Sequence, residues 1–115
     1  MNDGVDLMLA SGPHVLRGME FYEGHLIAYS MGDFANYYDF AASGDLTLSG
    51  ILHVTLTAHG GFVAGSWDSI LLSPSGQPRY DSTHQSAAFV NTLSREDFGA
   101  DAALIRANGS IAPPR

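Results

Sequence analysis

The sequence contains neither cysteine nor lysine, and each absence removes a class of function. Without cysteine the chain cannot form disulfides, thiolate-ligated zinc sites, iron–sulfur sites or a thiol nucleophile. Five arginines stand against twelve acidic residues, which gives a formal net charge of −7. Because nucleic-acid binding depends on clustered cationic side chains, we expect no nucleic-acid partner.

Long hydrophobic runs are also missing. Apolar runs such as 50–52 and 70–72 fall far short of the roughly 20 residues that a membrane helix needs, so we expect no membrane insertion by this chain. Residues 1–10 carry Asp3 and Asp6 and no basic residue, so we expect no export signal there.

The composition is typical of one small globular domain, with 45% hydrophobic and 15% charged residues in 115. No repeat or linker divides residues 1–115, which we interpret as a single unit. The segment 107–115 ends in Pro113 and Pro114, and we expect it to be an irregular tail.

Strand patterns dominate the chain up to residue 76. The run 5–10 predicts a short buried strand, and the runs 18–22 and 26–31 predict a hairpin around Glu23, Gly24 and His25. Apolar and polar residues alternate along 50–58, which predicts a strand whose apolar face is formed by Leu52, Val54 and Leu56. The run 62–72 predicts a second strand, with one face formed by Val63, Trp67 and Leu71. Turns are expected at 58–61 and 73–76.

Helical signals come last. Ser82 and Gln85 have the spacing of a capping box, and an apolar helix face follows at Phe89, Val90 and Leu93. A second cap signature at 94–97 predicts a separate short helical turn. The predicted fold class is therefore α+β and rich in strands.

Two segments invite functional interpretation on their residues alone. The segment 32–47 predicts a long loop in which Phe34 is the first of several aromatics, which would suit carbohydrate or peptide binding or ordinary packing. Ser30, within 28–32, partly matches the nucleophile elbow G-x-S-x-G, but a weak helix start follows it. His14 follows the turn Ser11-Gly12-Pro13, where it could bind a metal or bond a backbone carbonyl.

Residues 10–34 resemble the C-terminal signature of the bacterial capsule-synthesis CapA family, which is associated with poly-γ-glutamate production. The resemblance is expected to continue through residues 93–99 and so to span nearly the whole chain. In that family a strand leads into Gly-His-His-Pro-His-Val, then a hairpin, then Tyr-Ser-Leu-Gly-Asn-Phe. His14 matches the last histidine, while Ser11 and Gly12 replace the preceding pair. The second motif is matched by Tyr29, Ser30, Gly32 and Phe34, whereas Met31 and Asp33 replace its leucine and asparagine.

The resemblance implies a fold like the calcineurin-type metallophosphoesterases, a four-layer α/β sandwich with a two-metal site. This chain would be its C-terminal portion, and His14 its sole metal-ligand candidate. Manganese or zinc would then bind only in a complete site. Relatives in that family are associated with the cell envelope.

The resulting expectation is a C-terminal segment of a capsule or poly-γ-glutamate biosynthesis protein that is not catalytic alone. One alternative is a metal-dependent phosphoesterase that is active only when completed by a missing N-terminal part or by self-association. The other is a carbohydrate- or peptide-binding module. The expected partners are accordingly a second copy or that missing part.

Overall fold

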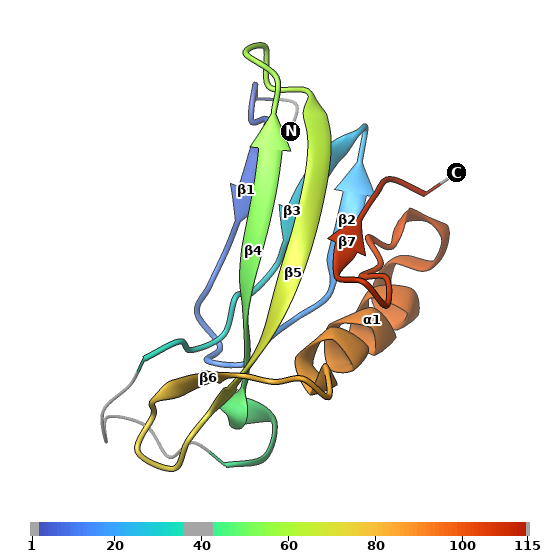
Figure 1. Cartoon of the computed structure of the whole chain (residues 1–115). Helices are drawn as coiled ribbons and strands as arrows, with labels where there is room; N and C mark the ends of the chain where they lie inside the picture. The colour runs from blue at the N-terminus through green and yellow to red at the C-terminus, as the bar shows by residue number, and fades with distance from the viewer. Residues whose placement is uncertain (1–2, 36–42, 115) are drawn as a thin grey trace.

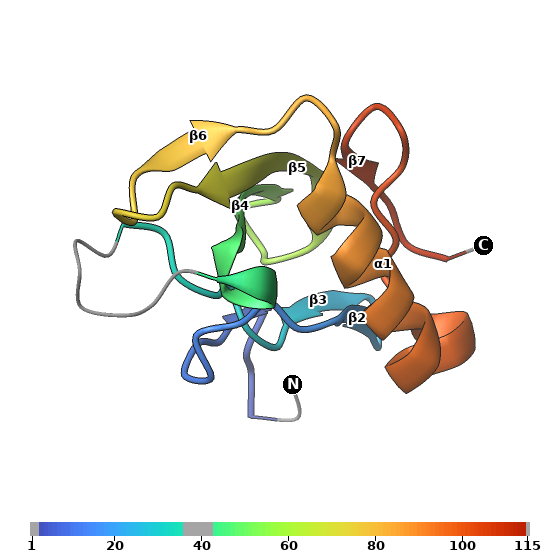
Figure 2. The ribbon, with the colours of Figure 1, turned by 90° about the horizontal axis from the view of Figure 1, so that it is seen from below.

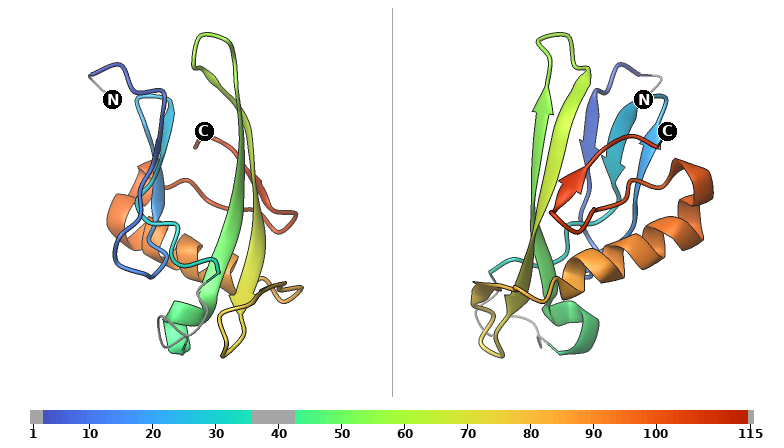
Figure 3. Two further views of the ribbon diagram at one scale, coloured as in Figure 1. Left: turned by 90° about the vertical axis from the view of Figure 1, so that its left-hand side faces the viewer. Right: turned by 45° about the vertical axis from the view of Figure 1, so that its right-hand side comes forward.

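Two β-sheets and one α-helix make up the part of the chain described by the computed structural model, which covers residues 3–35 and 43–114 (Figure 1). The sheets face each other as two layers, as the edge-on view of Figure 3 shows. The prediction of a strand-rich α+β fold is confirmed. The four-layer sandwich is not confirmed by the described residues.

The first sheet has the strand order β1-β3-β2 and comprises β1 (Leu7–Leu9), β2 (Met19–Tyr22) and β3 (His25–Ala28). Strand β1 runs parallel to β3, and β2 runs antiparallel to it. Positive φ angles at Glu23 (51°) and Gly24 (84°) form the tight turn between β2 and β3. The predicted hairpin is therefore confirmed, with His25 as the first residue of β3 and not part of the turn.

The second sheet is built around a long hairpin of β4 (Leu48–Leu56) and β5 (Phe62–Leu72), preceded by the 3-10 helix η1 (Gly44–Thr47). Strand β6 (Pro78–Tyr80) pairs with one end of β5. Strand β7 (Ser110–Ile111) pairs with β5 at 65–66. The expected irregular tail at 107–115 thus contains a strand, because its backbone bonds to an otherwise open edge of β5.

Helix α1 (Gln85–Phe98) lies against both layers and is followed by the 3-10 helix η2 (Gly99–Asp101). It packs on β2 of the first sheet and on β4 and β5 of the second, so it closes one side of the sandwich (Figure 2). In the described part of the chain, no helix is both long and apolar enough to span a membrane.

The hydrophobic core lies between the sheets and under α1. Its fully buried members include Leu16 and Val90, each at 0% exposure, and Trp67 lies beside them at 4%. The predicted alternation along β4 is confirmed, since Leu52 and Val54 pack on this core while the intervening side chains are exposed.

The start of α1 differs from the predicted capping box at Ser82. The helix begins at Gln85 after His84, which has a left-handed φ of 56° and no side-chain cap bond. The cap is Asp81, whose Oδ2 accepts the Gln85 N–H at 2.9 Å, while Oδ1 accepts the Thr83 N–H at 2.9 Å and its hydroxyl at 2.6 Å. Burial raises the pKa of Asp81, but these bonds and the nearby His84 outweigh it and hold the pKa below its usual value.

The separate helical turn predicted at 94–97 is also wrong, because these residues continue α1. The Ser94 hydroxyl donates to the Val90 carbonyl at 2.7 Å and accepts the Met19 N–H at 2.9 Å. Serine at this position therefore ties the helix to β2 and does not begin a new helix.

Two predictions of burial change for reasons of sheet geometry. A register shift at Thr55–Leu56 in the β4–β5 pairing leaves Val63 57% exposed, and Phe62 packs on the core in its place. Strand β1 lies at a sheet edge, so the strand predicted as buried exposes Met8 at 46% and Leu9 at 56%.

Candidate functional site

The two halves of the sequence motif meet at one edge of the first sheet. Strands β1 and β3 are parallel neighbours, so the segments that follow them leave the sheet at the same edge. Two backbone bonds hold the segments together, from the Ala10 N–H to the Ala28 carbonyl (2.9 Å) and from the Met31 N–H to the Ala10 carbonyl (3.0 Å). Leu16 also forms an isolated bridge with Met31.

At this edge the side chains of His14 and Asp33 are paired. The His14 Nδ1 lies 2.7 Å from the Asp33 Oδ1, across 19 residues of sequence. The His14 side chain is 44% exposed, whereas that of Asp33 is 11% exposed. His14 adopts a positive φ of 61°, which a histidine seldom adopts. The loop thus presents the imidazole to solvent while the carboxylate is held beneath it.

The neighbours of Asp33 explain why its side chain is well positioned. The hydroxyl of Ser49, itself fully buried, donates to the Asp33 carbonyl. Gly32 precedes it with φ of 64°, and a Cβ there would come within 3.3 Å of Leu16. Asp33 therefore follows a tight turn that is anchored on β4.

The chemistry of this pair is that of an oriented imidazole. A carboxylate bonded to Nδ1 fixes the orientation of the ring. The structure shows a carboxylate bond of His14, to Asp33, while the alternatives of a metal ligand and a backbone-carbonyl bond stay predictions.

The remaining motif residues differ in exposure and in the contacts they make. Ser30 is 2% exposed and accepts the Gly32 N–H at 3.3 Å, and residues 31–35, the described residues directly after it, do not form the helix that a nucleophile elbow requires. The loop residues exposed to solvent are Ser11, Gly12 and Pro13. Phe34 is 45% exposed, and the other aromatics of the predicted loop, Tyr37, Tyr38 and Phe40, lie outside the described residues.

The side chain of Tyr29 lies away from the His14–Asp33 pair, on the outer surface of the first sheet. Its hydroxyl donates to the Glu20 Oε1 at 2.6 Å, and its ring stacks on Phe98 with centroids 5.0 Å apart. The bond to Glu20, followed by burial and the charge of Glu20, raises the pKa of Tyr29 to about 12.

The described residues do not fit a metal centre. They contain no group of three or more His, Asp or Glu side chains that could hold an ion. A catalytic zinc takes three protein ligands, and a two-metal site needs more. The other described histidines lie elsewhere: His25 bonds the Asp6 carbonyl (3.0 Å), and His53 forms an exposed pair with Asp68 (3.1 Å).

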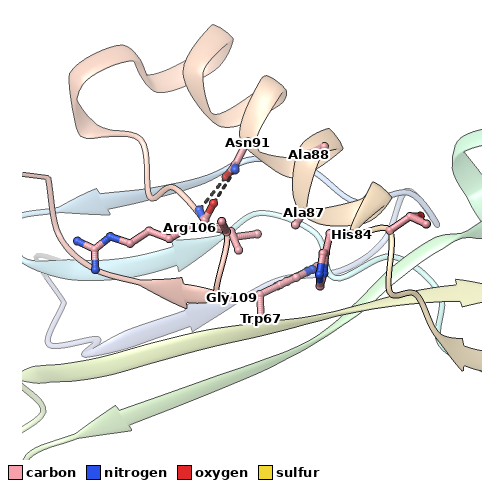
Figure 4. A pocket seen from close by; sticks show the side chains of 10 residues that line it. Trp67, His84, Ala87, Ala88, Asn91, Arg106 and Gly109 are labelled. Carbon is pink, nitrogen blue, oxygen red and sulfur yellow. Dashed lines mark hydrogen bonds between the residues drawn. The ribbon is translucent and has the colours of Figure 1, made fainter.

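A separate cleft of about 360 Å³ lies beneath the start of α1, beside Trp67 (Figure 4). Two of its polar side chains are bonded within the protein. The amide of Asn91 bonds both backbone groups of Ile105, at 2.8 and 2.7 Å, and the indole N–H of Trp67 donates to Ser86 at 3.1 Å. The cleft contains none of the candidate site residues predicted from the sequence.

Sequence reasoning found His14 but did not assign it a partner. Asp33 was named as a motif residue, and the signal that could have paired it with His14 is topological: a carboxylate follows the strand that neighbours the strand before His14. That signal is usable only once the parallel pairing of β1 and β3 is known.

One family model matches the segment that contains both motifs. Residues 1–38 match the model of the bacterial capsule synthesis protein PGA_cap, which supports the resemblance read from residues 10–34, and this match does not extend to residues 93–99. No curated protein sequence matches the chain.

Proposed function

We propose that this chain, whose residues 1–38 match the model of the bacterial capsule synthesis protein PGA_cap, is a non-catalytic portion of a CapA-like protein of capsule or poly-γ-glutamate synthesis. Its role is to supply the His14–Asp33 pair to a site that further polypeptide completes. The pair is the observation that carries this proposal, because it is an oriented imidazole 44% exposed at the edge where functional loops gather.

The absence of a third ligand among the described residues supports the non-catalytic role. Metal-assisted attack on a phosphoester requires ions that clamp the reacting oxygens and acidify a bound water. One imidazole that shares a carboxylate cannot assemble such a centre. The fold proposed for the completed site is that of a metallophosphoesterase.

Strand β1 supports the idea that further polypeptide packs on this chain. It lies at the edge of its sheet, and Val5 (41%), Met8 (46%) and Leu9 (56%) expose apolar surface beside its unpaired side. Open edges with apolar side chains favour pairing with another strand. The partner is either the N-terminal part of a CapA-like protein or a second copy.

The test measures hydrolysis of bis(p-nitrophenyl) phosphate by the purified chain, with and without manganese or zinc. We expect no hydrolysis above buffer and less than one bound metal per chain by elemental analysis. His14→Ala is compared with His53→Ala, a matched control because His53 also pairs with an aspartate but lies on the exposed face of β4.

Hydrolysis that is lost in His14→Ala and kept in His53→Ala would contradict the non-catalytic role and favour the active phosphoesterase. Light scattering after gel filtration then separates the partners. A dimer supports completion by a second copy, whereas a monomer at high concentration rejects it in favour of another polypeptide.

A further inference from the structure

A hollow of about 300 Å³ lies where the start of β2, the end of β3 and the last turn of α1 meet. It lies on the outer side of the first sheet and contains neither His14 nor Asp33. We call it the aromatic hollow, and its lining residues are Arg17, Gly18, Tyr29, Asp97 and Phe98.

The floor of the aromatic hollow is a rigid pair of rings. Tyr29 and Phe98 stack with an interplanar angle of 17°, and the Tyr29 hydroxyl is held by Glu20 at 2.6 Å. Tyr29 is nevertheless 40% exposed, so part of its ring faces solvent. An aromatic surface that is fixed before binding loses little conformational entropy when a ligand stacks on it.

The helix is held close enough to shape this hollow in advance. A Cβ on Gly18 would come within 2.9 Å of the Ser94 backbone nitrogen, so glycine is what allows α1 to approach. The bond from the Met19 N–H to the Ser94 hydroxyl, 2.9 Å, locks the contact.

The rim of the aromatic hollow carries one positive and one negative side chain. Within the described part of the chain, neither Arg17 nor Asp97 forms an ion pair or a side-chain hydrogen bond. A guanidinium offers several donors and a carboxylate offers acceptors, so together they can bind adjacent hydroxyl groups. The lining thus carries one cation and one anion, and the carboxylate of Glu20, which accepts the Tyr29 hydroxyl, is a second anion next to it.

We propose that the aromatic hollow binds a neutral sugar residue of a glycan. One sugar face would lie on the Tyr29 ring, and its hydroxyls would bond Arg17 and Asp97. The volume is at the lower end of the range for ligand pockets and suits one monosaccharide unit. Two carboxylates disfavour an anionic ligand, and Arg17 disfavours a cationic one.

The test is titration of the ¹⁵N-labelled full chain with methyl glucoside, methyl galactoside and methyl mannoside, followed by amide chemical shifts. We expect saturable shifts for at least one glycoside at residues around the aromatic hollow, with an affinity on the order of millimolar. N-acetyl-arginine amide and methyl glucuronide serve as cationic and anionic probes.

Tyr29→Ala is expected to weaken glycoside binding by at least about tenfold, and Tyr29→Phe, which keeps the ring, by no more than about threefold. Arg17→Gln is expected to weaken it by about fivefold and changes only an exposed side chain. Tyr80→Ala is the matched control, because Tyr80 is 63% exposed on β6, outside the aromatic hollow, and should leave binding unchanged.

Three outcomes overturn the proposal. These are no shift with any glycoside, stronger shifts with the arginine amide, which would indicate a cationic peptide ligand, or glycoside binding unchanged in Arg17→Gln and Tyr29→Ala. If Tyr29→Ala does not fold, Tyr29→Phe and Arg17→Gln still decide the matter.

Discussion

Replacing Asp81 by alanine tests the cap of α1, where the structure and the sequence pattern disagree. The Asp81 carboxylate accepts three hydrogen bonds from Thr83 and Gln85 and is 5% exposed. The predicted cap, Ser82, is exposed and forms no described bond to the helix.

The cost of the substitution follows from these bonds. Loss of a helix cap costs about 1 kcal/mol, and hydrogen bonds to a charged group add about 1.5 kcal/mol or more. Because Thr83 and Gln85 are exposed, water partly satisfies the donors that are left, so we expect a total of about 2–3 kcal/mol. For a domain of this size that lowers Tm by about 10 °C.

The assay is urea and thermal unfolding followed by circular dichroism at 222 nm. Ser82→Ala is the control and should change stability by less than about 0.5 kcal/mol. If Ser82→Ala costs as much as Asp81→Ala, the capping assignment is refuted.

The same carboxylate predicts a pH dependence. Its folded pKa lies below the usual value, so its stabilising contribution is complete above the unfolded pKa of about 3.9 and is lost as the pH falls through the folded pKa. The difference in stability between wild type and Asp81→Asn should therefore shrink below about pH 4. A difference that is constant from pH 7 to pH 2 would contradict the lowered pKa.

Three further substitutions test other contacts. Gly50→Ala would place a Cβ 2.0 Å from the Trp67 ring, so we expect about 2–3 kcal/mol of destabilisation and a changed Trp67 fluorescence spectrum, and an unchanged spectrum would argue against this contact. Phe62→Ala should lower the free energy of unfolding in urea by about 2–3 kcal/mol, because Phe62 packs edge-on against Phe21 with ring centroids 4.9 Å apart. Val63→Ala should lower it by less than about 0.5 kcal/mol. A larger loss from Val63→Ala than from Phe62→Ala would exclude the bulge. In absorbance titration at 295 nm, Tyr29 should ionise near pH 12, and Glu20→Gln should move this ionisation towards pH 10. The stabilisation from the Glu20 contact is therefore present below pH 10 and lost as the pH rises towards 12.

Local sequence signals determined much of this protein. The hairpin around Glu23 and Gly24 follows from turn chemistry, and the alternation along 52–56 follows from the two-residue period of a strand. The motifs within residues 10–34 sufficed to predict the resemblance that the family model over residues 1–38 supports, because side-chain identity and spacing can be compared without a fold.

Only the tertiary structure decided which groups meet. Asp81 caps α1 because its carboxylate is buried facing the first turn, which a Ser-x-x-Gln spacing does not reveal. Because of the bulge in the β4–β5 pairing, Phe62 packs on the core in place of Val63. Strand β7 forms because β5 has an open edge. His14 meets Asp33 because β1 and β3 are parallel neighbours. Each of these depends on pairing between distant segments, and a local pattern holds no information about the segment on the other side.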